Sequence, residues 1–462
     1  LPYSALPQIP RDSPDELDLE TSHVYERMND PPVDTDSIFS RYQVCRARCL
    51  DRKLWHIDIQ EFASQYEPWK KNRVVLDFQD LIDVAYDHGD EGPPFRITHL
   101  FVDEAQDLDQ AQKKLIIRWL PYLKTLILVG DPDQAIYGFR GSDAQTFYEF
   151  RHNYPGGHHP VLTKSRRVPR AVHQVAQRIV TQIDDRDPID FIPRDADGFA
   201  EDCEPLTSSI GAENCLQVAL SHPGKTVMFL AMCRDDLGPI IAELRAQGLP
   251  FCNPWRPTMG AWNPLGAHAG TSTAKRLLYW IIPNEGYPEE NIPVRPWTYL
   301  DLELALGCTA ISKFLKRGVG KKLKQLAAGN PQDTVTREDL LAWVNTRELL
   351  LWMAQAQPDF LQAMCSQGYQ NQLDYCCRVL GRVGRKALLE KPKIYVGTIH
   401  SVKGAEADIV FVAPDVSYRA YKQAMEDQRE LDNLYRVFYV GVTRARDGVY
   451  LCKDRSRQSV TW

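Results

Sequence analysis

Runs of apolar residues that end abruptly in acidic or polar residues recur along this chain. RITHLFVDEAQD, which begins at Arg96, and TLILVGDPDQ, which begins at Thr125, both have this pattern, which is typical of buried parallel strands. The intervening LDQAQKKLIIRWLPYL has helical spacing of its apolar positions. The order strand, helix, strand predicts an α/β layer. Before it, residues 41–70 have mixed apolar and charged spacing that predicts short helices.

A second series of strand patterns begins near residue 225. It comprises KTVMFLAMC at 225–233, KIYVGTIH at 393–400, ADIVFVAPD at 407–415 and GVYLC at 448–452. Helical patterns such as VPRAVHQVAQRIVTQI and LGPIIAELRAQG lie before or between these strands. We therefore expect a second α/β domain.

The stretch from about Pro254 to Glu390 separates the strands of this second domain and has a different pattern. Its apolar positions have helical spacing, and it contains the basic segment Lys313–Lys324. An inserted, mostly helical accessory domain is the simplest interpretation. The basic segment and the cluster Arg382, Arg385 and Lys386 could grip duplex phosphates, or they could form a solvated helical face.

The composition narrows the class of protein only slightly. Of the 462 residues, 44% are hydrophobic and 25% charged, and the net charge of -6 means that any nucleic-acid contact must use local basic patches. Eleven cysteines without a paired C-x-x-C framework favour reduced thiols, and hence a cytoplasmic, intracellular protein. No apolar run is long enough to span a bilayer, and the first residues lack a signal-peptide pattern, so we expect no membrane partner.

Acidic residues directly follow the first two predicted strands. Asp103, Glu104, Gln106 and Asp107 come after LFV, and the segment Gly130–Gln134 follows the next strand. Parallel strands present their carboxyl ends at one edge of a sheet, where ligands bind. One carboxylate there can hold Mg²⁺ through its water shell, and a neighbour can orient or deprotonate an attacking water. A capped loop without catalytic function is the alternative interpretation.

Aromatic residues follow at once in the sequence IYGFRG. Tyr137 and Phe139, with Arg140 beside them, could stack on the bases of a single nucleic-acid strand. The alternative is that both rings only fill a core.

Four motifs in a fixed order identify a family resemblance. DEAQD, GDPDQAIYGFRG, GTIHSVKGAE and YVGVTRAR resemble motifs II, III, V and VI of the UvrD/Rep-like superfamily 1 DNA helicases. DFQDLI, residues 77–82, also resembles the segment that leads back into the first RecA-like domain of that family. The resemblance extends from Asp77 to Cys452.

The resemblance implies roles for the acidic residues and for the glutamine. Asp103 would anchor Mg²⁺ beside Glu104, and Glu104 would be the catalytic base. Gln134 would sense the γ-phosphate of ATP and link hydrolysis to DNA. The DNA-binding residues implied in this way are Tyr137, Phe139 and Arg140, together with Thr398, His400 and Ser401, which would line the DNA or the interdomain cleft. Taken alone, His400 would more often be a structural histidine.

Two arginines are candidates for the positive charge that phosphoryl transfer requires. Arg444 in YVGVTRAR matches a family arginine finger, and Arg167 in LTKSRRVP aligns with another. The family usually has Asn-Tyr-Arg where this chain has Ser-Arg-Arg, so Arg166 replaces the tyrosine that would stack on adenine. A guanidinium can also stack on a base, although KSRRVPR could simply be a solvated basic patch. The resemblance also implies that Glu406 contacts the nucleotide sugar.

The larger departure from the family is the absence of a phosphate loop, G-x-x-x-x-G-K-[ST], before DEAQD. Gly224–Thr226 supplies Gly-Lys-Thr but leads into a predicted strand, and Gly318–Lys322 lacks the hydroxyl residue. The first residue is Leu1 rather than methionine. We therefore expect a truncated chain that lacks the N-terminal Walker A segment of the family.

The resulting expectation is an α/β fold with two RecA-like parallel-sheet domains, the first incomplete, and mostly helical accessory insertions. The expected divisions are 1–76 for an N-terminal helical accessory region, 77–150 for part of the first RecA-like domain, 151–254 and 391–462 for the two parts of the second, and 255–390 for the helical insertion.

The resemblance implies an ATP-dependent, Mg²⁺-dependent DNA helicase or translocase that moves on single-stranded DNA. Its motif forms are more similar to those of the 3'-to-5' branch of the family, which implies that direction. Its partners would be single-stranded DNA and a duplex junction, with replication or repair proteins as possible further partners. Two alternatives remain open. One is a nucleotide-inactive DNA-binding module, and the other is the helicase subunit of a recombination nuclease.

Overall fold

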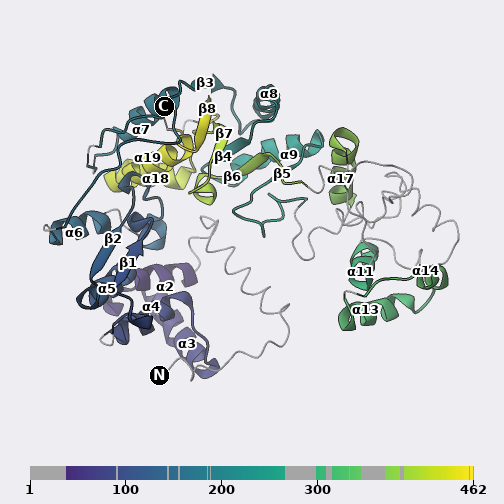
Figure 1. Cartoon of the computed structure of the whole chain (residues 1–462), viewed down its shortest axis with the longest axis horizontal. Coiled ribbons are helices and arrows are strands. Elements are labelled where there is room, and N and C mark those ends of the chain that lie inside the picture. The colour runs from purple at the N-terminus through teal and green to yellow at the C-terminus, as the bar shows by residue number, and fades with distance from the viewer. Residues whose placement is uncertain are drawn as a thin grey trace.

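The computed structural model describes twelve segments of the chain, which form three groups of elements (Figure 1). The described residues are 38–89, 92–142, 145–154, 157–184, 186–187, 189–265, 298–307, 315–331, 333–344, 370–384, 390–456 and 458–460. None of the helices in these ranges combines the length and the apolar character that a membrane crossing requires.

The first group is built around two parallel strands, β1 (His99–Val102) and β2 (Thr125–Leu128), in the register His99 opposite Thr125. Its helices are α2 (Ile38–Ala47), α3 (Ile57–Arg73), α4 (Phe78–Asp87), α5 (Gln110–Trp119) and α6 (Gln145–Asn153). The predicted order strand, helix, strand is confirmed, as are the helices expected in residues 41–70.

The burial expected for these two strands is wrong. Phe101 is 69% exposed and Ile127 is 39% exposed. Parallel strands are normally buried because further strands and helices cover both of their faces. In the described residues this sheet contains only two strands, so part of its apolar surface remains open.

The second group is a six-stranded parallel sheet in the order β3-β8-β7-β4-β6-β5. Four of its strands confirm the sequence prediction: β4 (Val227–Ala231), β6 (Ile394–Thr398), β7 (Ala407–Val412) and β8 (Ala445–Cys452). The edge strands β3 (Phe199–Cys203) and β5 (Phe251–Cys252) were not predicted. The sequence FAEDC is acidic, and β5 has only two residues, so neither has the apolar run of a central strand.

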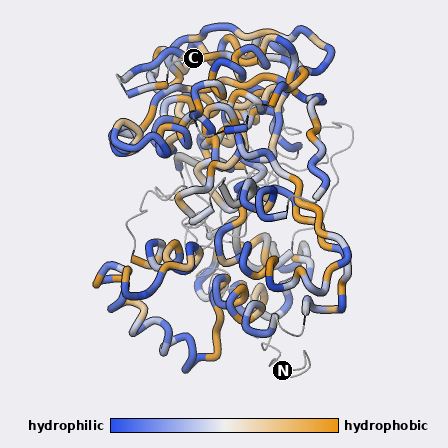
Figure 2. The backbone as a smooth tube through the Cα atoms, turned by 90° about the vertical axis from the view of Figure 1, so that its left-hand side faces the viewer, coloured by the Kyte–Doolittle hydropathy of each residue, from blue (hydrophilic) through white to orange (hydrophobic). Residues whose placement is uncertain are grey.

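Helices cover both faces of this sheet, and each face has its own hydrophobic core. The residues of β4 alternate between the two cores, with Phe229 in one and Met228 and Leu230 in the other. Figure 2 shows the hydrophobic strands in the middle of this group. The covering helices are α7 (Arg170–Val180), α8 (Ser209–Leu220), α9 (Gly238–Ala246), α17 (Gln370–Val383), α18 (Tyr418–Glu426) and α19 (Gln428–Val442).

The third group contains α11 (Tyr299–Gly307), α13 (Val319–Gly329) and α14 (Arg337–Trp343). Leu302, Leu323 and Trp343 belong to its small hydrophobic core. In sequence, these helices and α17 lie between β5 and β6, where the helical insertion is expected. All regular elements described there beyond β5 are helices.

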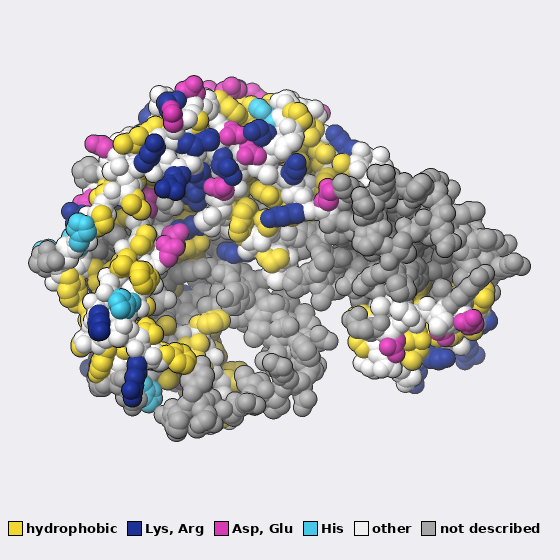
Figure 3. All heavy atoms as spheres, viewed as in Figure 1, with side chains coloured by type: hydrophobic (Ala, Val, Ile, Leu, Met, Phe, Trp, Pro, Cys, Tyr) yellow, Lys and Arg dark blue, Asp and Glu magenta, His cyan; other side chains and the backbone are white. Residues whose placement is uncertain are grey.

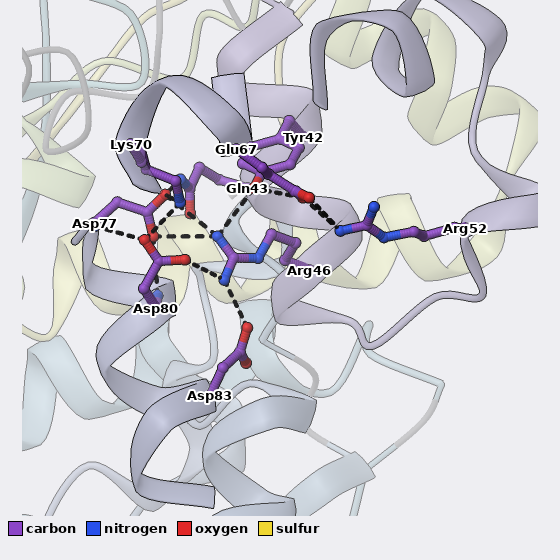
Figure 4. A network of polar contacts seen from close by, with 9 residues as sticks. All are labelled: Tyr42, Gln43, Arg46, Arg52, Glu67, Lys70, Asp77, Asp80 and Asp83. Atoms are coloured by element: carbon purple, nitrogen blue, oxygen red, sulfur yellow. Dashed lines mark hydrogen bonds and ion pairs between the residues drawn. The ribbon is translucent and has the colours of Figure 1, made fainter. Parts of the chain in front are cut away.

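An ion-pair network joins α2 and α3 to the start of α4 (Figure 4). Asp77 caps α4 and forms a reciprocal capping box with Asp80. The Lys70 ammonium, which is buried, lies 2.6 Å from an Asp77 oxygen and 2.5 Å from an Asp80 oxygen. Arg46 contacts the same two carboxylates and also Asp83. These contacts fix the helix that leads into β1.

Candidate active site

The carboxylates that follow β1 are exposed at the end of the strand. Asp103 accepts a hydrogen bond from the backbone N–H of Glu104 at 2.9 Å. Glu104 has a left-handed backbone with φ of 51°, a conformation that is costly for a residue with a side chain and is often found at functional sites. Its side chain is 51% exposed. Both carboxylates can therefore meet a ligand or water.

Gln106 forms hydrogen bonds to residues that follow both β1 and β2. Its side chain is fully buried, its Nε2 donates to Glu104 Oε2 at 2.5 Å, and its Oε1 accepts from the Asp131 N–H at 3.0 Å. Gly130 permits this contact, because a Cβ at that position would lie 2.3 Å from Gln106 Oε1. Gln106 thus positions Glu104, a role that the sequence motif alone does not reveal.

Gln134 lies in the short 3₁₀ turn η7 (Pro132–Gln134), where Asp131 orients its amide group. Asp131 accepts from Gln134 Nε2 at 2.7 Å and from the Asp133 N–H at 3.0 Å. Burial of the Asp131 carboxyl, with the neighbouring charge of Asp133, raises the pKa of Asp131 to about 6. The amide oxygen of Gln134 is directed toward the second sheet.

Arg444 reaches Gln134 from the C-terminal end of α19. Its Nη2 donates to Gln134 Oε1 at 3.1 Å, and its Nε donates to the Val440 carbonyl at 2.9 Å. The side chain is 1% exposed, and no carboxylate within the described ranges forms an ion pair with it. Burial, with the nearby charge of Arg167, lowers the pKa of Arg444 to about 9.

Arg167 is the second cation at this site. Burial lowers its pKa, while Glu406, Tyr439, Asp131 and Glu104 act in the opposite direction. Its Nε is buried without a hydrogen-bond partner among the described residues.

Two desolvated guanidinium groups close to each other are unfavourable unless an anion lies between or beside them. Arg444 and Arg167 therefore suit a ligand with several negative charges, such as a polyphosphate.

Arg166 and Glu406 are both exposed to solvent. Arg166 is exposed, so its guanidinium is available to stack on a planar group. The Glu406 side chain is 45% exposed and pairs with Arg446 at 3.0 Å.

An aromatic contact joins the two sheet groups. Phe139 meets the His400 ring edge to face with centroids 5.5 Å apart, and the Tyr137 hydroxyl donates to the His400 carbonyl at 3.2 Å. Tyr137 and Phe139 are half-buried, and Tyr137 also packs against a hydrophobic core of the second group. The backbone of Arg140 completes the turn η8 (Gly138–Arg140), and its side chain lies outside the described part of the structure.

Thr398, the last residue of β6, and Ser401, in the turn η12 (Ile399–Val402) that follows, are both buried. The Ser401 hydroxyl donates to the Thr398 carbonyl at 2.7 Å, and Thr398 Oγ1 accepts from the Ser401 N–H at 3.3 Å. Asn253, at the end of β5, donates to Ser401 Oγ at 3.2 Å. In this arrangement both hydroxyls shape the turn that carries His400. Their predicted contact with DNA stays a prediction.

Lys403 is a functional candidate that the sequence did not single out. Its buried ammonium lies 2.5 Å from Asp107 Oδ2 and 3.8 Å from Glu104 Oε2. It also lies 5.0 Å from the centre of the Tyr137 ring. Lys403 follows β6, whereas its three partners belong to the first group. A lysine inside a motif gives no signal of such partners, which only the fold brings together.

The basic segments are partly used within the chain. Arg382 donates to the Gln247 carbonyl at 2.9 Å and to Gln247 Oε1 at 3.0 Å. Figure 3 shows basic side chains along the lower edge of the group formed by α11, α13 and α14. Lys313, Arg385 and Lys386 lie outside the described residues. Gly224–Thr226 leads directly into β4, as expected for a segment that is not a phosphate loop.

Two segments of the chain match sequence models of known protein families. A sequence model of the UvrD/REP helicase N-terminal domain matches residues 37–155, and one of the UvrD-like helicase C-terminal domain matches residues 355–456. The two matched segments are thus similar to the N-terminal and C-terminal domains of UvrD-like helicases, respectively. The predicted resemblance and the predicted α/β fold are thereby confirmed.

Individual relatives agree with these matches. The putative ATP-dependent DNA helicase YjcD of Bacillus subtilis is 30% identical over 132 residues, which are 27% of this chain and 17% of that protein. The ATP-dependent DNA helicase PcrA of Leuconostoc citreum is 29% identical over 28% of this chain and 18% of its own length. PcrA of Staphylococcus aureus is 30% identical over 27% of this chain and 18% of its own length. The matched segment thus spans less than a fifth of each of these relatives.

The residues of this candidate site fit a magnesium–nucleotide complex. Mg²⁺ is usually held by one or two carboxylates together with phosphate oxygens and water, and not by a complete cage of protein ligands. Asp103 and Glu104 supply two exposed carboxylates. No group of three or more potential metal ligands occurs in the part of the chain that is described.

Proposed function

We propose that this chain works as an ATP-dependent DNA helicase or translocase of the UvrD type, moving 3'-to-5' along single-stranded DNA. The observation that carries the proposal is the hydrogen bond from Arg444 on one sheet group to Gln134 on the other. This bond joins a candidate phosphate sensor to a candidate arginine finger. Binding or hydrolysis of a nucleotide phosphate beside it would therefore change the position of one sheet group relative to the other.

On the nucleotide side, Asp103 and Glu104 would hold Mg²⁺, which would polarise the phosphoryl group and offset its charge. Glu104 would also accept a proton from the attacking water. Arg444 and Arg167 would bind the phosphate oxygens as charge develops on them. Arg166 and Glu406 would meet the base and the sugar. Desolvation of the two arginines supports this assignment, because an isolated buried cation binds an incoming anion strongly.

On the DNA side, the contacts with the tracked strand would come from Tyr137, Phe139, Arg140, Thr398, His400 and Ser401. Phe139 and His400 would contribute most directly, since their rings touch each other across the two groups. A base stacked at this position would separate or reorient the two rings. That movement would also displace the Lys403 ammonium, which lies over the Tyr137 ring and beside the Glu104 carboxylate. DNA binding would thereby change the position of Glu104, the proposed catalytic base.

The coupling step follows from a competition for one guanidinium. A phosphate oxygen carries a full charge and forms a stronger hydrogen bond than the neutral amide oxygen of Gln134. Bound ATP would therefore draw Arg444 toward the phosphate and release or reorient Gln134. The two groups would close around the nucleotide and reopen after hydrolysis, moving the strand past Phe139.

The test measures the linkage between nucleotide and DNA. Affinity of the 462-residue chain for a fluorescent oligo-dT would be measured with and without Mg²⁺ and a non-hydrolysable ATP analogue. We expect the nucleotide to change that affinity by about five-fold or more. Arg444→Gln should remove most of this effect. Arg170→Gln should leave the effect of nucleotide on DNA affinity unchanged, because the exposed Arg170 pairs only with Asp195 and Asp197 among the described residues.

Hydrolysis gives a second readout. Glu104→Gln should abolish DNA-stimulated phosphate release while nucleotide binding persists, because the variant keeps its size and loses its base. Undiminished turnover in Glu104→Gln would refute the assigned role. Because the 462 residues contain no phosphate loop before DEAQD, wild-type turnover is expected to be slow.

A nucleotide-inactive DNA-binding module is the second candidate for the 462 residues, in which no phosphate loop precedes DEAQD. It predicts DNA binding with no measurable affinity for the ATP analogue and no linkage. Such a result would overturn the motor proposal.

A further inference from the structure

The segment between α7 and β3 places an arginine against the turn that carries Gln134. Arg186 Nε lies 3.3 and 3.2 Å from the two oxygens of Asp133, and Arg186 Nη2 lies 2.8 Å from Asp133 Oδ2. The side chains are 10% and 3% exposed. This is a buried, two-pronged arginine–carboxylate pair, the arrangement that fixes geometry most strictly.

The segment that carries this arginine is also bonded to α19, the helix that precedes Arg444. The backbone N–H of Asp184 donates to Asp432 Oδ1 on α19 at 3.2 Å. On the other side of Arg186, Asp187 pairs with Arg151 of α6. The segment therefore connects α19 to the first group independently of the Arg444–Gln134 bond.

The Asp133 carboxylate also controls its neighbours in η7. Asp131 accepts from both the Asp133 N–H and Gln134 Nε2, so a displacement of Asp133 displaces the amide of Gln134 as well. We propose that Arg186 is a positioning residue, which holds the η7 turn on α19 so that Gln134 presents its oxygen to Arg444. Its relevance to catalysis rests on the proposed function, whereas its role in holding the turn does not.

Charge compensation is the second part of this role. Asp131 and Asp133 are two carboxylates in one turn, and Arg186 neutralises the second. The other charged or titratable groups that act on Asp131 are Arg444 and Tyr439 from the end of α19, and Arg167, which precedes α7. A protonated Asp131 would donate a hydrogen bond from one oxygen. The Gln134 amide would then turn its oxygen toward Asp131 and away from Arg444.

The positioning role can be tested without nucleotide by titrating Asp131 in the full chain. Aspartate labelled with ¹³C at the carboxyl would be followed by NMR, and the Asp131 resonance identified by its loss in Asp131→Asn. With Arg186→Gln we expect the titration midpoint to rise by about one pH unit, because Asp133 then keeps an uncompensated charge. The double variant Arg186→Gln/Asp133→Asn should return the midpoint to the wild-type value or below it.

Arg170→Gln is the matched control, since it removes an arginine whose described ion pairs both lie within the second group. Its titration midpoint should equal that of the wild type. An unchanged midpoint in Arg186→Gln would overturn the proposal, as would a midpoint in the double variant that stays raised. Rearrangement of the fold alone would not produce a rise in one variant and its reversal in the other.

The link to the reaction is measured separately. Arg186→Gln should reduce the effect of nucleotide on oligo-dT affinity by about five-fold, and Arg170→Gln should not. Equal reductions in both variants would overturn the assignment to the reaction. Should the wild type show no linkage, the proposed motor function fails, while the titration of Asp131 still decides whether Arg186 holds the turn.

Discussion

The buried carboxyl of Asp131 makes stability depend on pH in a defined direction. Burial, followed by the charge of Asp133, raises its pKa from 3.8 to about 6. Between these two values the folded state binds more protons than the unfolded state. The free energy of unfolding must therefore fall as the pH rises through this window, and it stays reduced above pH 6.

The magnitude follows from the two pKa values. Their difference corresponds to about 3 kcal/mol at neutral pH. Asp131→Asn removes this cost, but one of the two oxygens that accept from Asp133 and Gln134 becomes a donor group, at about 1 kcal/mol. We expect Asp131→Asn to be about 2 kcal/mol more stable than the wild type at pH 8 and about 1 kcal/mol less stable near pH 4.

Urea unfolding followed by circular dichroism at a series of pH values measures this difference. Asp197→Asn is the control, because its side chain is 91% exposed and its ion pair with Arg170 lies in solvent. The stability difference between that variant and the wild type should vary little across the series. A difference for Asp131→Asn that does not change with pH would refute the description of η7 as a site of destabilising negative charge.

Three further predictions concern neighbouring contacts. Gly130→Ala should destabilise the chain by about 1–3 kcal/mol in thermal or urea unfolding, because its Cβ would meet Gln106 at 2.3 Å. Gly307→Ala, with open space around the new Cβ, should not. Phe139→Ala should weaken binding to oligo-dT by about 1–3 kcal/mol, as measured by fluorescence anisotropy, and leave nucleotide binding unchanged; an equal loss of both would contradict stacking. Lys403→Met should lower the free energy of unfolding by about 1–3 kcal/mol, because Asp107 loses its partner. The loss is limited because Asp107 keeps some exposure to water, and unchanged unfolding would show that the ion pair contributes nothing.

The strands and helices of the second sheet could be predicted because their patterns are strong. In β4, VMFLA is buried along its whole length, and α7 has a clear apolar face, so periodicity alone locates both. The edge strand β3 could not be found in this way. FAEDC is acidic and partly exposed, and it becomes a strand because it pairs with β8, from Phe199 opposite Gly448 to Cys203 opposite Cys452. Tertiary pairing outweighs local preference there.

For the first sheet, the pattern predicted the strands correctly and their burial incorrectly. LFV in β1 is apolar enough for a fully covered strand, yet Phe101 is largely exposed. An apolar run shows that a strand suits a buried position, but it does not show which element provides the cover. That information lies in elements elsewhere in the fold, so a local pattern cannot contain it.

The candidate site shows the same division between residue type and partner. Glu104 and Gln134 were predicted from acidic and amide side chains at strand ends, and Arg444 from the resemblance to the helicase motifs. Lys403 and Arg186 were not predicted, although both make buried ion pairs close to these residues. Arg186 pairs with Asp133, which is next to Gln134, and Lys403 pairs with Asp107, three positions after Glu104. Asp133 lies more than fifty residues from Arg186 in sequence, and Asp107 lies almost three hundred residues from Lys403. A local pattern cannot reveal such pairs.

These two cations and Arg444 give the contact between the groups an uneven charge balance. Lys403 and Arg186 each neutralise an acid of the first group, so their ion pairs are complete without a ligand. Arg444 meets only neutral acceptors among the described residues, and Arg167 nearby adds further positive charge. In the described residues neither arginine forms a direct ion pair with a carboxylate, and Asp131 and Glu104 act on both of them only from further away. An anion entering beside Gln134 would gain two charge-assisted contacts without breaking either completed ion pair, which is the condition for binding a phosphate while the two groups stay attached to each other.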